Sequence, residues 1–115
     1  MMGLAQQFEP LFTGKMRLTM CGQIANTKRG DGVITQMRYG TGTAPTNGAA
    51  LTGIAIGTGI VGTSAIGNAL MPFCHDIIVA GLTPRTVYWF DGSDAAYTGG
   101  SAVVSNIQMT SEELR

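Results

Sequence analysis

The last third of the chain constrains the fold most, because it alternates turn signals with strand signals and carries no helical periodicity. Thr83-Pro84 begins a turn, and the aromatic run from Val87 to Phe90 is typical of a strand. Gly99-Gly100 then reverses the chain, and residues 102–109 alternate as a second strand does. A chain that closes on a strand must add it to an existing sheet, so we expect this segment to be structural.

The preceding residues predict further strands. Residues 15–24 and 33–39 alternate apolar with polar side chains, and residues 71–80 form an apolar run. We interpret residues 52–56 and 60–65 as two short strands joined by a glycine turn, since a helix there would lose about 1 kcal/mol per glycine relative to alanine. The sequence predicts an all-β fold, an antiparallel β-sandwich of seven or eight short strands, with the jelly roll as one arrangement of them.

No linker or shift in composition divides the chain. We therefore expect residues 1–115 to form a single sandwich domain with a short N-terminal arm over about residues 1–12. Seven Lys and Arg balance seven Asp and Glu, and charged residues make up only 12% of the sequence. So little charge protects poorly against self-association, which favours a homo-oligomer with much of its surface against other protein. The zero net charge argues against a nucleic-acid partner.

The charged residues leave a long gap, with none between Arg38 and Asp76. A membrane span is a poor explanation, because Gly, Thr, Asn and Pro dilute the segment and no window of about 18 residues is continuously apolar. A subunit-facing β segment explains the gap better, and we expect no membrane partner. The predicted interface combines the N-terminal arm, the loop at residues 40–48 and the uncharged residues 49–70, with the candidates Phe8, Phe12, Pro45, Asn47, Leu51, Ile54, Ile56 and Ile60.

Candidate catalytic chemistry is nearly absent. His75 is the only histidine, and no G-x-S-x-G motif selects a nucleophilic serine. Residues 57–62 match G-x-G-x-x-G, but the full helix that a dinucleotide site needs after this motif is missing. We predict no enzyme activity, no cofactor and no metal site. Cys21 and Cys74 are interpreted as buried free thiols, while a disulfide remains open if their strands are neighbours.

Three stretches, residues 8–26, 31–53 and 81–114, carry a resemblance to a known family. The run RYGTGTAPTNGAALTG at residues 38–53 is its most specific part. The chain resembles a small β module of bacteriophage and prophage virion proteins, often placed at the C-terminal end of tail-fibre-like chains. The entry into the first strand also resembles trimeric jelly-roll heads of the tumour-necrosis-factor type, which supplies a trimer by analogy only.

The resemblance implies a non-enzymatic structural protein of a phage virion, assembled in the cytoplasm of a bacterial host. As a stand-alone module the chain fits a capsid decoration protein, whose partners are the major capsid protein or other virion proteins. The alternative is a tail-fibre or tail-tip module that recognises a bacterial surface glycan. Its sugar site would use exposed aromatic and acidic side chains: Tyr88, Trp89, Tyr97, Asp91 and Asp94. For the aromatic strand we favour the other interpretation, in which alternate residues of Tyr88–Phe90 fill the core of the sandwich.

Overall fold

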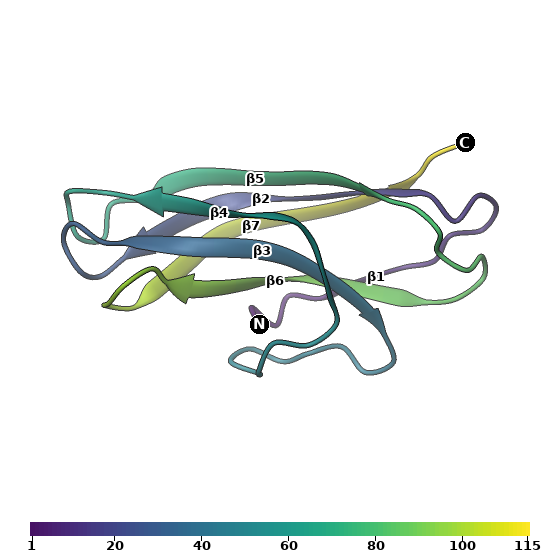
Figure 1. Ribbon diagram of the computed structural model, residues 1–115, viewed down its shortest axis with the longest axis horizontal. Coiled ribbons are helices and arrows are strands. Elements are labelled where there is room, and N and C mark those ends of the chain that lie inside the picture. Colours follow the sequence, from purple (N-terminus) through teal and green to yellow (C-terminus); the bar gives the residue numbers. More distant parts are fainter.

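The computed structural model describes all 115 residues and contains seven antiparallel strands and no helix. The strands are β1 (Gln6–Phe8), β2 (Met16–Asn26), β3 (Gly32–Thr41), β4 (Ile54–Thr63), β5 (Met71–Val79), β6 (Tyr88–Ala96) and β7 (Ala102–Glu113). They form a four-stranded sheet in the order β1-β6-β3-β4 and a three-stranded sheet in the order β5-β2-β7 (Figure 1). The predicted antiparallel β-sandwich is confirmed. A complete jelly roll has eight strands, so the simpler sandwich describes this fold.

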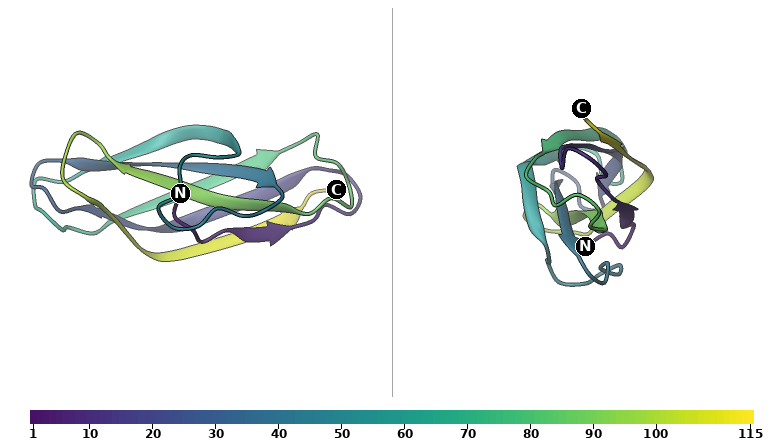
Figure 2. Two further views of the ribbon diagram at one scale, coloured as in Figure 1. Left: turned by 90° about the horizontal axis from the view of Figure 1, so that it is seen from below. Right: turned by 90° about the vertical axis from the view of Figure 1, so that its right-hand side faces the viewer.

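The core lies between the two sheets, along the 47 Å length of the molecule (Figure 2). Alternate residues of a strand face opposite sides of a sheet, and here most inward positions are apolar. The largest fully buried apolar side chains come from the central strands β2, β3 and β6: Leu18, Met20, Ile24, Val33, Met37 and Phe90. This core is where the alternation of residues 15–24 and 33–39 places it.

The predicted turn before the aromatic strand forms a tight corner. The hydroxyl of Tyr88 accepts a hydrogen bond from the backbone N–H of Thr83 at 2.9 Å. This contact matches the tyrosine corner of immunoglobulin-type sandwiches, in which a tyrosine near the start of a strand bonds back to the backbone just upstream. Phe8, which we expected at an interface, is instead buried here, because its ring stacks on Tyr88 with 5.4 Å between centroids.

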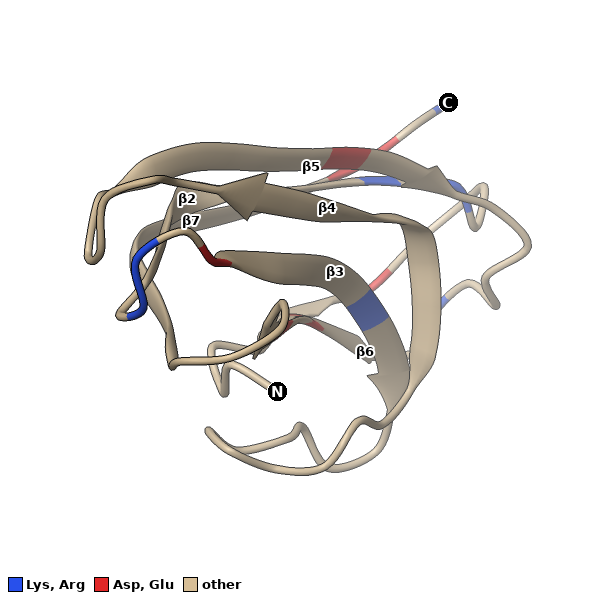
Figure 3. Cartoon of the chain, turned by 60° about the vertical axis from the view of Figure 1, so that its left-hand side comes forward, with Lys and Arg blue, Asp and Glu red and all other residues tan.

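The predicted pair of short strands at residues 52–65 is a single strand, β4, with a bulge. Thr35 of β3 pairs with Ile60, and Met37 pairs with Ile56, so three residues of β4 lie opposite Gln36 alone. Gly57 adopts a φ of 70° at this point, a conformation that glycine reaches without strain. β4 therefore bends sharply in its middle (Figure 3).

The N-terminal residues lie on the domain itself. The N–H of Met2 donates to the carbonyl of Gly92 at 2.8 Å, and its side chain is buried in the core. The N–H groups of Gly3 and Leu4 donate to the buried carboxylate of Asp91 at 2.9 and 3.2 Å. The beginning of the predicted arm thus completes the sandwich and is not a free contact surface.

Cys21 and Cys74 lie directly opposite each other in the β2–β5 pair and are joined by a disulfide. The sequence left a disulfide open only if the two strands are neighbours, and the structure meets this condition. The structure has no free cysteine, so the disulfide is the state found here and not the buried free thiols. Cys74 is exposed, so the bond lies on the outer face of the three-stranded sheet.

Candidate interaction surface

The only histidine is a contact between the two sheets. His75 on β5 is 3% exposed, and its Nε2 lies 3.0 Å from the hydroxyl oxygen of Thr35 on β3. Burial lowers the pKa of His75 below its usual value. The ring of Phe73 packs edge-on against the imidazole, with 5.9 Å between centroids. His75 therefore joins the two sheets inside the sandwich, away from solvent.

No three His, Cys, Asp or Glu side chains come together in a group that could hold a metal ion. The structure also contains no helix long and apolar enough to cross a membrane.

The surface formed by residues 49–70 is apolar and uncharged. Five large hydrophobic side chains of this segment are exposed: Leu51, Ile54, Val61, Ile66 and Leu70. β4 and its flanking loops carry no charged residue, while β3 and β5 beside them do (Figure 3). Exposed apolar side chains in a segment without charge are typical of a protein–protein contact. We call residues 49–70 together with Ile34, the exposed neighbour of Val61, the uncharged surface.

The loop at residues 42–53 is held close to the four-stranded sheet. The guanidinium of Arg38 donates to the carbonyls of Thr52 and Gly53 at 2.8 and 3.0 Å. The indole N–H of Trp89 donates to the carbonyl of Thr41 at 3.2 Å. Gly53 has a φ of 74°, and a Cβ there would approach the Trp89 ring to 2.6 Å, so this position requires glycine. These contacts place Leu51, 66% exposed, over the outer face of the sheet.

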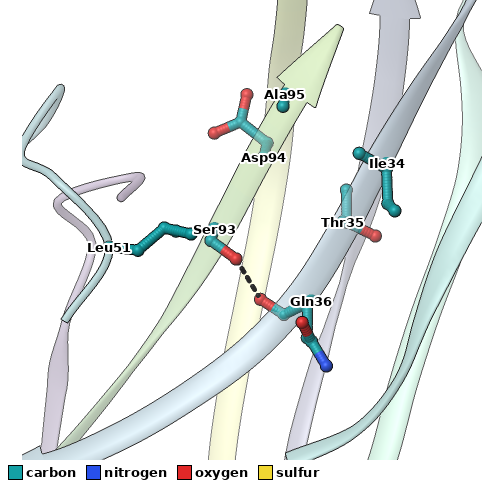
Figure 4. Close-up of a pocket in the computed structure, with 7 residues that line it drawn as sticks. All are labelled: Ile34, Thr35, Gln36, Leu51, Ser93, Asp94 and Ala95. Atoms are coloured by element: carbon teal, nitrogen blue, oxygen red, sulfur yellow. Dashed lines mark hydrogen bonds between the residues drawn. The ribbon is translucent and has the colours of Figure 1, made fainter. Parts of the chain in front are cut away.

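A hollow of about 170 Å³ lies between this loop and the sheet (Figure 4). Its lining residues are Ile34, Thr35 and Gln36 of β3, Ser93, Asp94 and Ala95 of β6, and Leu51 of the loop. The hydroxyl of Ser93 donates to the carbonyl of Gln36 at 3.2 Å and is therefore already satisfied. Burial raises the pKa of the Asp94 carboxyl. The hollow thus offers apolar walls with one acidic group at its edge.

The other interface candidates in the loop after β3 and in β4 differ in exposure. Asn47 is exposed and Pro45 half-buried in the same loop, and Ile54 is exposed at the beginning of β4. Ile56 and Ile60 are half-buried, because they lie opposite the buried Met37 and Thr35 and point toward the core. The structure therefore exposes Leu51 and Ile54 to solvent, whereas Ile56 packs against the core and has a structural role.

Phe12 is exposed on the loop between β1 and β2, and this loop is held by several hydrogen bonds. The carboxylate of Glu113 accepts hydrogen bonds from the N–H groups of Leu11, Phe12 and Thr13 at 3.0, 2.9 and 3.0 Å. These backbone donors lower the pKa of Glu113. The guanidinium of Arg115 lies 4.5 Å from the centre of the Phe12 ring. Phe12, 62% exposed, is thus presented to solvent on an ordered loop.

The residues proposed for a sugar site are mostly inaccessible. Trp89 is 3% exposed, and Tyr88 and Asp91 are also buried. Asp91 already binds the N-terminal backbone, and Tyr88 forms the corner contact. Only Tyr97 is exposed, on the loop between β6 and β7. These side chains therefore form no shared platform on which a sugar ring could stack.

The fold and this surface define the protein as a small, disulfide-linked β-sandwich with an uncharged apolar surface. Comparisons with known protein families, with curated proteins and with solved structures find no match to this chain.

Proposed function

We propose that the protein is a structural protein of a bacteriophage virion, a capsid decoration protein that binds assembled shell subunits through its uncharged surface. The observation that carries the proposal is the set of exposed apolar side chains on residues 49–70, a segment without a single charge. The resemblance of residues 8–26, 31–53 and 81–114 to phage virion modules supports a phage virion as the particle in which this surface would bind its partner.

The size of the molecule suits this role. A stable protein–protein interface takes about 800 Å² from each partner. That is roughly an eighth of the 6198 Å² that the chain exposes. A decoration protein repeats such a contact at many equivalent sites, so even a modest free energy per copy adds up over the shell. Its function is mechanical: it adds burial energy across the junctions between shell subunits.

The test is binding of the purified protein to empty, expanded shells of the phage that encodes it. We expect the protein to sediment with the shells and to raise their melting temperature. Val61→Asp places a charge on the uncharged surface and should weaken binding. Thr110→Asp, which places the same charge on the outer face of β7, is the matched control and should bind normally.

Failure of the wild-type protein to bind shells, together with binding to host cells, would refute this proposal and favour the tail-tip alternative. Copy number separates the two roles independently, because we expect hundreds of copies per particle for a decoration protein and a few dozen or fewer for a tail component. Because Tyr88 and Trp89 are buried, Tyr97 is the one exposed aromatic side chain among those named for the sugar site of the tail-tip alternative.

A further inference from the structure

Two features of the molecule match in size and polarity. One is Phe12, an exposed aromatic ring on a loop that Glu113 fastens through three backbone amides. A ring held in this way loses little conformational freedom when it binds, and buried aromatic side chains dominate the energetics of interfaces. The other is the hollow between Leu51, Ile34 and Ala95.

The hollow has the volume that a phenyl ring requires. An apolar cavity of about 150 Å³ in another protein binds benzene. The hollow here measures about 170 Å³, and its walls include the side chains of Ile34, Leu51 and Ala95. The ring of Phe12 is therefore the right size and polarity to fill it.

The charges at the two features are also complementary. Arg115 lies over the Phe12 ring, and Asp94 lies at the edge of the hollow. The two ion pairs of the chain, Arg17–Asp76 and Lys28–Asp31, involve neither of them. A Phe12 ring that enters the hollow brings a second cation toward a half-buried carboxylate that already lies in the field of the N-terminal ammonium and forms no ion pair.

We propose that copies of this chain assemble head to tail, with Phe12 of one copy in the hollow of the next and Arg115 facing Asp94. The loop that carries Phe12, between β1 and β2, lies at one end of the molecule (Figure 1). The hollow lies toward the other end, near the beginning of β3 and the end of β6. Because different surfaces of each copy meet, the contact is heterologous and forms a closed ring or an open chain.

This inference rests on the proposed assembly role of the uncharged surface and assigns part of that surface to the protein's own copies. The test measures the mass of the purified protein by sedimentation velocity over a range of concentrations. We expect wild-type protein to form oligomers. Phe12→Ala should weaken association by about 30-fold or more. Ile78→Ala, which truncates a side chain of similar exposure (56%) on β5, is the matched control and should associate as wild type.

A mixing experiment identifies the geometry. Ala95→Trp fills the hollow but leaves Phe12 intact, so we expect this variant to be monomeric alone. A mixture of Phe12→Ala and Ala95→Trp contains one intact ring and one intact hollow, and it should form dimers. Each variant is first checked for folding by circular dichroism. Leu51→Asp replaces Ala95→Trp in the mixture if the tryptophan disturbs the sheet.

Three results would overturn the inference: a monomeric wild type at every soluble concentration, normal association of Phe12→Ala, or a mixture that stays monomeric. Shell binding by a monomeric wild type would refute head-to-tail assembly and leave the decoration role standing. A wild-type protein that forms oligomers but does not bind shells would refute the decoration role and leave head-to-tail assembly standing. Charge reversal gives a second check, because Arg115→Glu should weaken association and Asp94→Lys on the neighbouring copy should restore it.

Discussion

The contact between Thr35 and His75 offers a quantitative test of how the two sheets are held together. Both side chains are buried, and 3.0 Å separates the Thr35 hydroxyl oxygen from Nε2 of the imidazole. Thr35→Val keeps the shape of the side chain and removes the hydroxyl. The imidazole nitrogen is then buried without a partner, which costs about 1–3 kcal/mol. This is a substantial part of the about 5–15 kcal/mol that stabilises a typical domain.

The cost should largely disappear when both partners become apolar. His75→Leu removes the imidazole and its edge contact with Phe73, so it is destabilising by itself. In the Thr35→Val/His75→Leu double variant no polar group remains unsatisfied at this site. We therefore expect the double variant to be about 1–2 kcal/mol more stable than the sum of the two single changes predicts.

Urea denaturation followed by Trp89 fluorescence measures each free energy of unfolding, because this single tryptophan is buried in the native state. The cycle is measured at pH 8, where the histidine is neutral in both states. Fully additive single and double changes would refute the proposed coupling. So would a Thr35→Val variant as stable as wild type.

The burial of His75 also makes stability depend on pH. Burial lowers the pKa of His75, so below the unfolded-state pKa of about 6.5 the unfolded chain binds more protons than the folded one. Stability from this group is therefore complete above that pH and is lost as the pH falls toward the native pKa. His75→Leu should remove this part of the dependence of the unfolding free energy on pH. An unchanged slope below about pH 6.5 in that variant would contradict the assignment.

Three further perturbations test other parts of the structure. Replacing both Cys21 and Cys74 with Ser opens a loop closed across 53 positions, which should lower the free energy of unfolding in urea by about 4 kcal/mol; equal stability would contradict the disulfide. Tyr88→Phe removes the corner hydrogen bond and should cost about 1 kcal/mol in the same assay, whereas no change would mean that the corner adds no stability. Glu113→Gln keeps the side-chain shape but removes the charge that binds residues 11–13, so amide exchange there should accelerate; unchanged exchange would show that the loop is ordered without this carboxylate.

Local signals in the sequence were sufficient for much of the fold. The alternation in residues 15–24 places Met16, Leu18 and Met20 in the core, where the structure finds them. The turn at Thr83-Pro84 and the aromatic strand after it are also where the sequence predicts them. These features depend on a period of two and on turn chemistry, which neighbouring residues determine.

The glycine-rich middle was harder to predict, because its glycines suggested a turn and the structure uses Gly57 for a bulge within one strand. A glycine with positive φ permits either outcome, and the pairing partner on β3 decides between them. The disulfide between Cys21 and Cys74 depends in the same way on strand order, which residues 53 positions apart do not reveal.

The candidate site depends on contacts between residues far apart in the sequence. Glu113 binds Leu11 across 102 positions, and neither residue carries a local signal of the other. The hollow likewise combines Ile34, Ala95 and Leu51 from two strands and a loop. The sequence offered Phe8, Phe12 and Leu51 alike as interface candidates. The structure exposes Phe12 and Leu51 but buries Phe8, because nothing in the sequence shows the stacking of Phe8 on Tyr88.

The bend in β4 explains why the uncharged surface would bind side chains and not an added strand. Sheets usually protect their edges with charge or proline, as β5 does with Pro72 and Asp76 and β7 does with Glu112. β4 is an edge strand with neither, which by itself would invite pairing with another chain. The bulge at Gly57 interrupts the straight edge that such pairing requires, because an added strand would have to follow the bend. The exposed apolar side chains of this region are therefore available to a partner that packs against them, which is how both the decoration role and the head-to-tail contact would use this surface.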